Sequence, residues 1–523
     1  MSPIVALFPL LAPLALFYAA HLSRSDAGRR PAKAMAAARW ASLFAFAVAI
    51  ASAVKVALLG AGTSLVIGPV GLGFSARMDA LSAVMMLVIS FVGVIVVQYS
   101  RAYLDGEARQ GAFFGGLCAT LAAALLLVMS GNLIQLVGAW IAMSLCLHRL
   151  LVFRADRARA VAAAFKKSVF ARIGDLALMG AAAAMLAAFG TADIAGIDVA
   201  ARAIKAEGGE IPTGATIAAV LVVVAALMKS AQFPFQGWLP EVVGTPTPVS
   251  ALLHAGIVNS GGFLAVRFSD VLVLSPGAMV IMAAVGGFTA LLAAMVMLTQ
   301  SSAKGALAWS TISQMGFMML QCGLGAFSLA VLHIVTHSLY KAHAFLSAGN
   351  AVRDATEAKR IGGARAVDRR TALIGLGAAV SLYLVAGFIF GAARFDGVQT
   401  LALGAIVAMG LGHLITQGLA GGEDAARRAG IAAALVAVVY AALQAGMALI
   451  MADSVPPKVV PTPLQAVVLM LAVGSFAAAA LAQAGLLMSA SDPHARMLRV
   501  HVSNGLYVDA LWSRLFAALR RHG

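Results

Sequence analysis

The feature that most constrains this chain is a series of apolar runs, each about as long as a membrane is thick. A helix of about 20 apolar residues spans the hydrocarbon core of a bilayer. Because lipid offers no partner to backbone polar groups, such runs must fold as helices. We therefore predict an all-α polytopic membrane protein with about 15 transmembrane helices, within a range of about 13–16. The runs lie at 3–21, 38–60, 78–100, 111–130, 133–153, 168–189, 214–236, 246–268, 276–298, 306–323, 326–350, 371–391, 397–420, 429–451 and 464–488.

The composition excludes most soluble classes of protein. Of the 523 residues, 62% are hydrophobic and 11% are charged, whereas a soluble domain is about 45–50% apolar and about 25% charged. A soluble enzyme, a disordered protein and a nucleic-acid binder are therefore excluded. The first apolar run has no basic segment before it and no small-residue cleavage site after it, so we interpret it as a span. Three cysteines, Cys118, Cys146 and Cys322, lie too far apart in sequence for a metal cluster or a disulfide framework.

Basic residues indicate the orientation of the spans. Connections after odd-numbered runs carry most of the Lys and Arg residues, whereas those after even-numbered runs carry few, among them Arg202, Lys205, Arg394 and Lys458. Basic loops stay in the cytoplasm, which also explains the net charge of +16. We expect a multi-pass membrane protein with the N-terminus outside and the C-terminus cytoplasmic.

The C-terminal tail 503–521 is amphipathic, with Leu506, Leu511 and Leu515 near one face. Such a helix lies on a membrane surface or contacts a partner. A surface helix that simply ends the fold is the alternative.

Lys229 is the first candidate for a functional group inside the membrane. It ends the apolar run 214–228, and Pro234 and Pro240 follow it. Proline removes a backbone donor and breaks a helix. A lysine beside a broken helix, next to freed carbonyls, is the arrangement of an ion or proton site. The alternative is a lysine whose side chain extends to the membrane interface.

Histidines and a second lysine form a column along the run 326–350. His333, His337 and Lys341 are each four residues apart, so they share one helix face, and His254 lies in an earlier run. Chains of titratable groups build proton relays in membranes. The two histidines have a spacing that suits a metal, but no nearby Cys, Asp or Glu completes a site. Packing and hydrogen bonding alone are the remaining alternative. We predict a proton relay of Lys229, His254, His333, His337 and Lys341, and no metal site.

Other polar residues are candidates for supporting roles. Arg172 and Asp175 are three residues apart on one helix face, so we predict an ion pair, with a purely structural role as the alternative. Lys304 and Gln314 lie near the start of the run 306–323 and line a polar path, unless Lys304 only marks a solvated helix end.

Four motifs resemble a known family. They lie at 229–240, 244–255, 304–316 and 333–342, the first reading Lys-Ser-Ala-Gln-Phe-Pro-Phe-Gln-Gly-Trp-Leu-Pro. They resemble the antiporter-like membrane subunits, which include the proton-pumping subunit of respiratory complex I and the Mrp-type sodium/proton antiporter subunits. The resemblance implies two inverted five-helix repeats, each with a broken helix, and a central row of Lys and His that moves protons.

This resemblance divides the chain into five parts. Residues 1–110 hold the first three helices, and 111–268 and 269–420 are the first and second antiporter-like repeats. Residues 421–490 hold the last two helices, and 491–523 form a cytoplasmic amphipathic tail.

Departures from the family pattern point to one branch. The relatives have an acidic residue after a Trp in the fifth helix, where this chain has Ile141. They also have a lysine in the second broken helix, whereas the stretch around 386–388 is followed only by Arg394 and Asp396. The chain ends soon after the last run, without the long helix of complex I. These departures, with 147–151 and 503–510, resemble the membrane subunit of the Dab inorganic-carbon accumulation complexes of bacteria.

The resemblance to that branch implies a function, a partner and a place in the bacterial inner (plasma) membrane. The partner is a large, soluble, zinc-containing subunit that resembles β-carbonic anhydrase, on the cytoplasmic face. A proton or sodium gradient through this chain would drive one-way hydration of CO2 to bicarbonate. Catalysis and zinc belong to the partner, so we expect no cofactor in this chain. The loops 154–167 and 353–370 either contact the partner or are simply solvated.

Three other functions stay open. A subunit of a complex I-like or hydrogenase complex would have the carboxylate in the fifth helix and usually a longer C-terminus. An Mrp-type cation/proton antiporter subunit would have several small membrane subunits as neighbours. A scaffold that conducts nothing would not need the lysines and histidines listed above.

Overall fold

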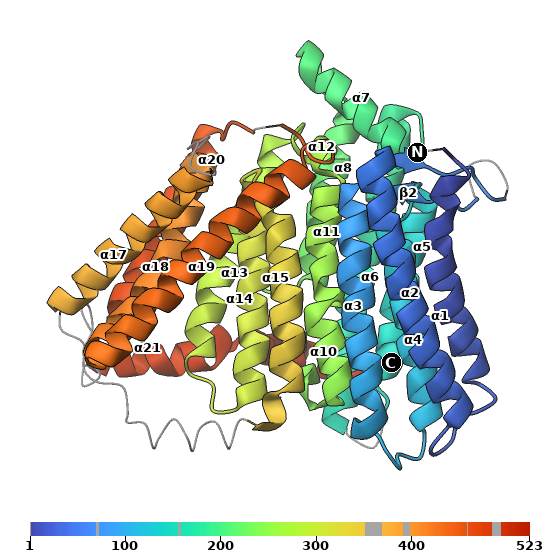
Figure 1. Ribbon diagram of the computed structural model, residues 1–523, viewed down its shortest axis with the longest axis horizontal. Helices are drawn as coiled ribbons and strands as arrows, with labels where there is room; N and C mark the ends of the chain where they lie inside the picture. The colour runs from blue at the N-terminus through green and yellow to red at the C-terminus, as the bar shows by residue number, and fades with distance from the viewer. Residues whose placement is uncertain are drawn as a thin grey trace.

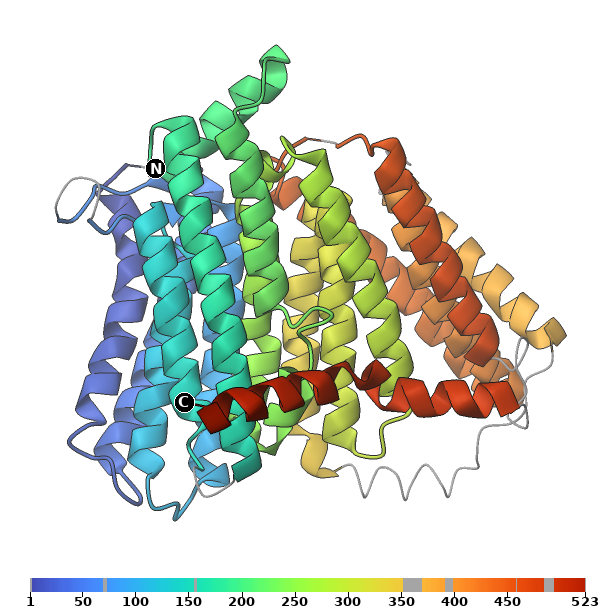
Figure 2. The same cartoon turned by 180° about the vertical axis from the view of Figure 1, so that it is seen from behind.

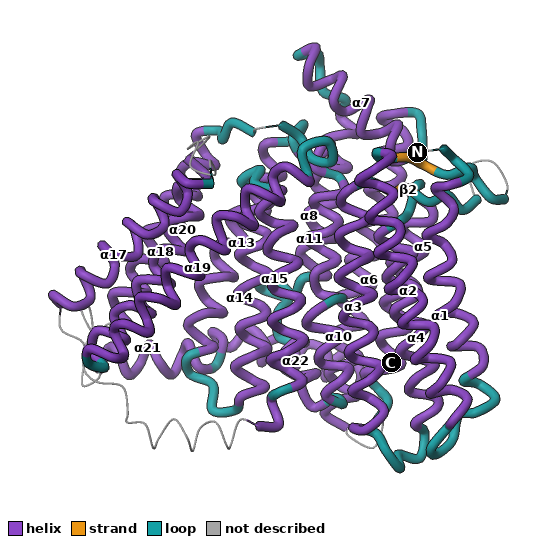
Figure 3. The backbone as a smooth tube through the Cα atoms, in the orientation of Figure 1, coloured by secondary structure: helices purple, strands orange, loops and turns teal. Residues whose placement is uncertain are grey.

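The computed structural model describes residues 2–68, 73–154, 158–350, 369–390, 398–457, 459–483 and 493–522. Within these ranges the chain is a bundle of long helices that lie side by side, with loops mainly at the two ends of the bundle (Figures 1 and 3). Two short antiparallel strands, β1 (Gly62–Thr63) and β2 (Arg77–Met78), precede the third long helix. The predicted class, an all-α polytopic membrane protein, is confirmed.

A long helix is present at each predicted apolar run. The first seven are α1 (Leu11–Leu22, after a 3-10 helix at Val5–Leu10), α2 (Ala32–Leu59), α3 (Ala80–Tyr103), α4 (Gln110–Val128), α5 (Leu133–Leu151), α6 (Ala158–Phe189) and α8 (Thr213–Lys229). The eighth run holds α10 (Thr247–Ala255) and α11 (Ser260–Arg267). The others are α13 (Pro276–Met297), α14 (Ala303–Gly323), α15 (Phe327–Leu346), α17 (Arg369–Ile389), α18 (Val398–Ala420), α19 (Glu423–Ile450) and α20 (Pro463–Gln483).

Twelve helices of the described residues are long and apolar enough to cross a membrane, judged by length and composition. The helices α8, α14 and α15 are not among them, although each lies at a predicted run. Helix α8 has only 17 residues because it ends at Lys229. Helices α14 and α15 have the length, but polar side chains such as His337 and Lys341 lower their hydropathy. The exceptions are thus helices that carry predicted site residues.

Helix α6 corrects one predicted boundary. It begins at Ala158, about ten residues before the apolar run that we expected at 168–189. The reason is the alanine-rich stretch 158–164, because alanine is the strongest helix former. Lys166 and Lys167 are therefore inside a helix and buried, not in a solvated loop at 154–167.

The two ends of the bundle differ. The chain ends lie at opposite ends of the bundle, and the short helix α7 (Ile194–Glu207) projects from the end that carries the N-terminus (Figures 1 and 2). The connections after α1 and α3 lie at the other end, near the C-terminus. This is the alternation that an odd number of spans requires.

The C-terminal tail packs on its own bundle. It forms α21 (Pro493–Ser503) and α22 (Val508–His522), which run across the long helices near one end (Figure 2). The Asp509 carboxylate lies 2.7 Å from the Lys166 ammonium. The Trp512 indole N–H donates to the Pro234 carbonyl at 2.8 Å. The amphipathic face that we predicted is therefore used, at least in part, within the chain.

The second predicted helix break does not lie at 386–388. Helix α17 is continuous through these residues, because a lone Gly387 without a proline is tolerated inside a helix. Helices α17, α18 and α19 share a small apolar core beside the main one. Arg394, Asp396 and most of the loop 353–370 lie outside the described residues.

Candidate functional site

The first helix break places Lys229 inside the bundle. Helix α8 ends there, and the chain runs without regular helix to α9 (Trp238–Glu241). Ala231 has a φ of 51°, which an α-helix does not allow, and Pro234 has no N–H to continue the ladder. The Ser230 hydroxyl donates to the Val258 carbonyl at 2.9 Å and ties this break to a second one. Lys229 is only 8% exposed.

Two lysines converge on one serine. The Lys229 ammonium lies 4.2 Å from the centre of the Trp140 ring and 3.5 Å from the Ser144 hydroxyl, both on α5. The Lys167 ammonium, from α6, lies 3.1 Å from the same hydroxyl and 3.0 Å from the Ser144 carbonyl. Ring faces attract cations, and the oxygens accept hydrogen bonds. Lys167 was not predicted as a site residue, because the apolar run alone placed it in a loop.

The predicted ion pair lies beside these lysines. The Arg172 guanidinium is 2.8 Å from the Asp175 carboxylate. Asp175 is buried, whereas the Arg172 side chain is 46% exposed. The charges of Lys167, Asp175 and Arg172 all act on Lys229. Arg172 and Asp175 therefore belong to the first cluster of charges.

The second helix break places His254. Helix α10 ends at Ala255, and a 3-10 turn, Ile257–Asn259, separates it from α11. The fully buried His254 ring has its Nδ1 atom 3.1 Å from the Thr311 hydroxyl of α14. The ring also stacks on Phe345 of α15, with centroids 4.2 Å apart. His254 therefore connects α10 with both neighbouring helices.

Helix α15 presents the column that its spacing predicts. The fully buried Lys341 donates to the Leu307 carbonyl at 3.2 Å. His333 Nδ1 lies 3.0 Å from the Gln321 side-chain oxygen, and the His333 and His337 ring centres are 6.1 Å apart. Neither ring nitrogen of His337 has a hydrogen-bond partner among the described residues. His254, His333 and Lys341 all act electrostatically on His337, so the four form a second cluster.

The predicted supporting residues Lys304 and Gln314 have different surroundings. The Lys304 ammonium donates to the Thr247 hydroxyl at 2.9 Å, at the start of α10. Gln314 is exposed on α14. Pro234 and Pro240 lie in the segment between α8 and α10, as predicted.

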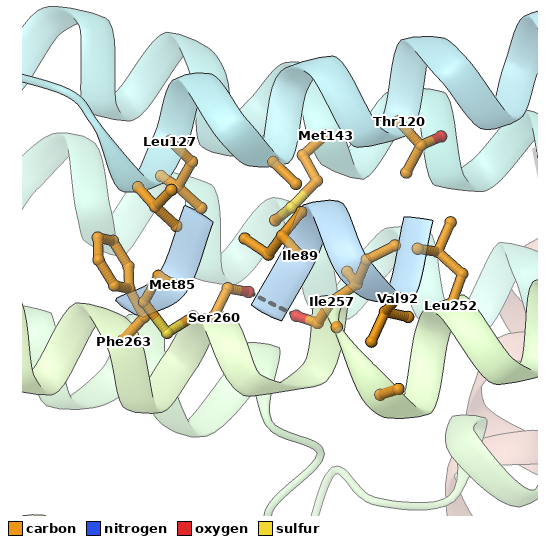
Figure 4. Close-up of a pocket in the computed structure, with 14 residues that line it drawn as sticks. Met85, Ile89, Val92, Thr120, Leu127, Met143, Leu252, Ile257, Ser260 and Phe263 are labelled. Atoms are coloured by element: carbon orange, nitrogen blue, oxygen red, sulfur yellow. Dashed lines mark hydrogen bonds between the residues drawn. The ribbon is translucent and has the colours of Figure 1, made fainter. Parts of the chain in front are cut away.

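An apolar cavity lies beside the second break. It is formed by α3, α4 and α5 on one side and by α10 and α11 on the other (Figure 4). Ile257, at the break, lines this cavity and also a second one that Lys167 and Lys229 line. Among the described residues no hydrogen bond joins Lys229 to His254. The predicted relay residues thus lie in two clusters, one that contains Lys229 and one that contains His254, His333, His337 and Lys341. The lining residues labelled in Figure 4 are Met85, Ile89, Val92, Thr120, Leu127, Met143, Leu252, Ile257, Ser260 and Phe263.

An ionic network at the end of the bundle near α7 was not predicted. Arg267, at the end of α11, donates to Asp79 at 2.5 Å, and Arg77 lies between Asp79 and Asp198, at 3.0 and 2.7 Å. Arg202 lies 2.9 Å from Asp270. The sequence offered a signal, since Asp79 and Arg267 lie at the ends of apolar runs, but it did not show that they meet.

The two buried carboxylates of this network differ. Burial would raise the pKa of Asp79, but Arg267 and Arg77 hold that pKa below its usual value. Burial raises the pKa of Asp198 to about 6, and this effect outweighs the attraction of Arg77. Asp198 is therefore a group that titrates near physiological pH.

The described residues contain no group of three or more His, Cys, Asp or Glu side chains that could hold a metal ion. The cysteines Cys118, Cys146 and Cys322 are free.

Fold and site together define a multi-span membrane subunit of the antiporter-like class. The chain belongs to the family described as NADH:quinone oxidoreductase/Mrp antiporter, which matches residues 130–416. The family described as complex I, chain 5 N-terminus, matches residues 65–114. The resemblance drawn from the four motifs is confirmed.

Several curated proteins are similar to this chain in sequence. The probable inorganic carbon transporter subunit DabB2 of Halothiobacillus neapolitanus is 43% identical over 331 residues, which are 61% of this chain and 59% of the relative. DabB of Hydrogenovibrio crunogenus is 46% identical over 277 residues, 52% of each chain. NADH-quinone oxidoreductase subunit L of Escherichia coli is 33% identical over 291 residues, 55% of this chain and 47% of the relative. The matches thus span from 47% to 59% of these relatives' length.

Solved structures agree with the fold. The Mrp complex from Dietzia sp. DQ12-45-1b matches with a TM-score of 0.65 at 24% identity, over 98% of this chain and 60% of that chain. An archaeal membrane-bound sulfane sulfur reductase matches with a TM-score of 0.59 at 18% identity, over 97% of this chain and 99% of that chain. At these identities the likeness concerns the fold alone.

Proposed function

We propose that this chain is the proton- or sodium-conducting membrane subunit of an energy-coupled inorganic-carbon uptake complex. The observation that carries the proposal is a buried set of lysines and histidines, two of them (Lys229 and His254) at helix breaks, in a chain whose relatives include probable inorganic carbon transporter subunits. Charged groups inside a membrane are costly and mark ion pathways. The retained cluster of His254, His333, His337 and Lys341 argues against a scaffold that conducts nothing.

The ion enters at the end that carries α7 and leaves at the end that carries α22. This direction follows from the positive-inside rule applied to the sequence, because the connections after odd-numbered runs carry most of the Lys and Arg residues. A membrane potential supplies about 2.3 kcal/mol per charge per 100 mV. One or two ions therefore supply enough free energy to bias the hydration of CO2.

The partner is a soluble, zinc-containing subunit that resembles β-carbonic anhydrase and docks on the cytoplasmic end. Zinc there lowers the pKa of a bound water so that hydroxide forms near neutral pH. This chain contributes the ion path, and its own residues take no part in the hydration chemistry. The two subunits couple through conformation or through local delivery of protons.

Growth rescue tests the proposal. The chain and its large soluble neighbour are expressed in a bacterium without carbonic anhydrase, which is grown in ordinary air with and without an uncoupler. Rescue that needs both proteins and disappears with the uncoupler is the expected result. The Lys229→Ala variant abolishes rescue, whereas the exposed Lys205→Ala variant retains it. An assembled complex that gives no rescue overturns the proposal.

A redox-linked proton pump of the complex I or hydrogenase kind, or an Mrp-type antiporter subunit, is the second candidate function. The observation in its favour is the 33% identity to NADH-quinone oxidoreductase subunit L. It predicts cation flux in vesicles with no rescue of growth.

A further inference from the structure

The cavity beside Lys229 is lined by hydrogen-bond donors. Lys167 from α6, Lys229 from α8 and Trp238 from α9 line it, together with Trp140 and Ile257. Trp238 is 3% exposed, and its indole N–H has no hydrogen-bond partner among the described residues. A buried donor without a partner costs free energy, and an indole nitrogen can only donate. The cavity therefore has an unused donor and two ammonium groups on its wall.

Basic groups around this cavity outnumber acidic ones. Lys167, Lys229 and Arg172 are basic, and Asp175 is the one carboxyl group of the described residues that acts electrostatically on Lys229. Asp175 pairs with Arg172. No carboxylate oxygen of the described residues lies within 4.0 Å of either the Lys167 or the Lys229 ammonium. The position where related chains carry an acid, by the motif resemblance, is Ile141 here.

The two ammonium groups also share a single hydroxyl. Ser144 Oγ lies 3.1 Å from the Lys167 Nζ atom and 3.5 Å from the Lys229 Nζ atom. Each ammonium has three N–H donors, and one hydroxyl with one carbonyl cannot satisfy six. Buried charges require a partner. A small anion in the cavity would accept from both lysines and from Trp238.

We propose that this cavity binds a small monovalent oxyanion, bicarbonate, between Lys167, Lys229 and Trp238. Bicarbonate has oxygen acceptors for all three donors and for the Ser144 O–H, because the two lone pairs of the Ser144 oxygen already accept from the two lysines. The choice of bicarbonate over other anions rests on the proposed function, whereas the anion site itself rests on the donors, the excess of basic groups and the unpartnered indole. Bound bicarbonate would then occupy the ion path and report the product level to the membrane subunit.

Direct binding tests the site apart from transport. Sodium bicarbonate is titrated calorimetrically into the purified full chain in detergent, in a chloride-free gluconate buffer, and sodium chloride is titrated separately. The wild type binds bicarbonate, and Lys167→Gln weakens binding about tenfold, as expected for the loss of a charge-assisted hydrogen bond. Trp238→Phe keeps the ring packing, removes only the N–H donor and weakens binding about threefold. Lys205→Gln, at an exposed lysine of α7, is the matched control and binds like the wild type.

Each outcome decides the proposal. Binding that is lost in Lys167→Gln and reduced in Trp238→Phe supports it. No binding by a folded wild type, or equal binding by the wild type and both variants, overturns it. Chloride affinity equal to that for bicarbonate overturns the choice of bicarbonate. Failed growth rescue with intact bicarbonate binding would overturn the proposed function alone, and rescue without binding would overturn this site alone.

Discussion

Lys229 meets a second lysine where related chains carry a carboxylate. The fifth helix has Ile141 at the acidic position, and Ser144, one turn further along, receives hydrogen bonds from Lys167 and Lys229. The first break therefore brings two lysines together, and no carboxylate oxygen of the described residues lies within 4.0 Å of either ammonium.

His337 gives a prediction that separates transport from folding. Because its ring nitrogens have no hydrogen-bond partner among the described residues, His337→Ala removes no polar contact of the fold. We expect proton flux to fall at least about tenfold, as for the loss of a proton-transfer group. The melting temperature should change by less than about 3 °C.

Vesicle flux and thermal melting of the same preparation measure both effects. A variant that is absent from the membrane would assign His337 a structural role instead. Thr336→Ala, at an exposed neighbour on α15, is the control.

Asp198 gives a pH prediction. Its usual pKa of 3.8 rises to about 6 in the folded chain, so the folded state holds the proton more tightly than the unfolded state. The stability contribution of Asp198 is therefore highest below about pH 4 and falls as pH rises towards about 6, by about 3 kcal/mol in total. The melting temperature of Asp198→Asn should depend less on pH between about 4.5 and 6.5 than that of the wild type.

Melting curves in detergent at several pH values measure this difference. The difference in melting temperature between the wild type and the variant separates the effect of Asp198 from that of other titrating groups. One of these is Glu241, whose pKa is also raised by burial. Identical pH slopes for both proteins would contradict the assignment.

At the scale of elements, α22 contacts the segment that follows the first helix break. The Trp512 ring packs against the rings of Phe170, Phe235 and Phe516, with ring centroids 5.2, 5.4 and 5.8 Å away. Its indole N–H donates to the Pro234 carbonyl. The Lys166 ammonium forms ion pairs with Asp509 of α22 and with Glu241 of α9. The tail therefore limits the movement of the segment that follows Lys229.

Hydrogen exchange tests this role of α22. Trp512→Ala removes the ring contacts and the hydrogen bond, so backbone amides at 230–241 should exchange at least about fivefold faster, consistent with a loss of about 1 kcal/mol. Leu511→Ala, at the neighbouring residue, is the control because Leu511 is 63% exposed. Equal exchange rates in both variants would show that α22 does not restrain the break.

At the scale of the whole molecule, the long helices were predictable because lipid forces apolar runs of this length into helices. Apolar runs did not predict the helix bounds where side chains are polar. Helix α6 includes Lys166 and Lys167, although both lie outside the predicted apolar run. The spacing of His333, His337 and Lys341 predicted their shared face, since a helix repeats every 3.6 residues. Contacts between distant elements, such as Lys167 with Ser144 and Arg267 with Asp79, carry no periodicity and could not be predicted.

The arrangement of the whole molecule also groups the predicted relay residues. Lys229 lies in one cluster and His254 in another, and Ile257 lines a cavity beside each helix break. The pattern of residues along the chain does not show this grouping, because it depends on how distant elements pack.

The most direct test of the account is potential-driven proton flux in liposomes that contain the purified full chain. We compare the wild type with Lys341→Gln, at the fully buried lysine of α15, and with His343→Gln, at an exposed residue of the same helix. The account predicts that a potential drives acidification in the wild type and in His343→Gln, and that Lys341→Gln is at least about tenfold slower. Equal flux through Lys341→Gln and the wild type would contradict the claim that the buried lysines and histidines form the ion path.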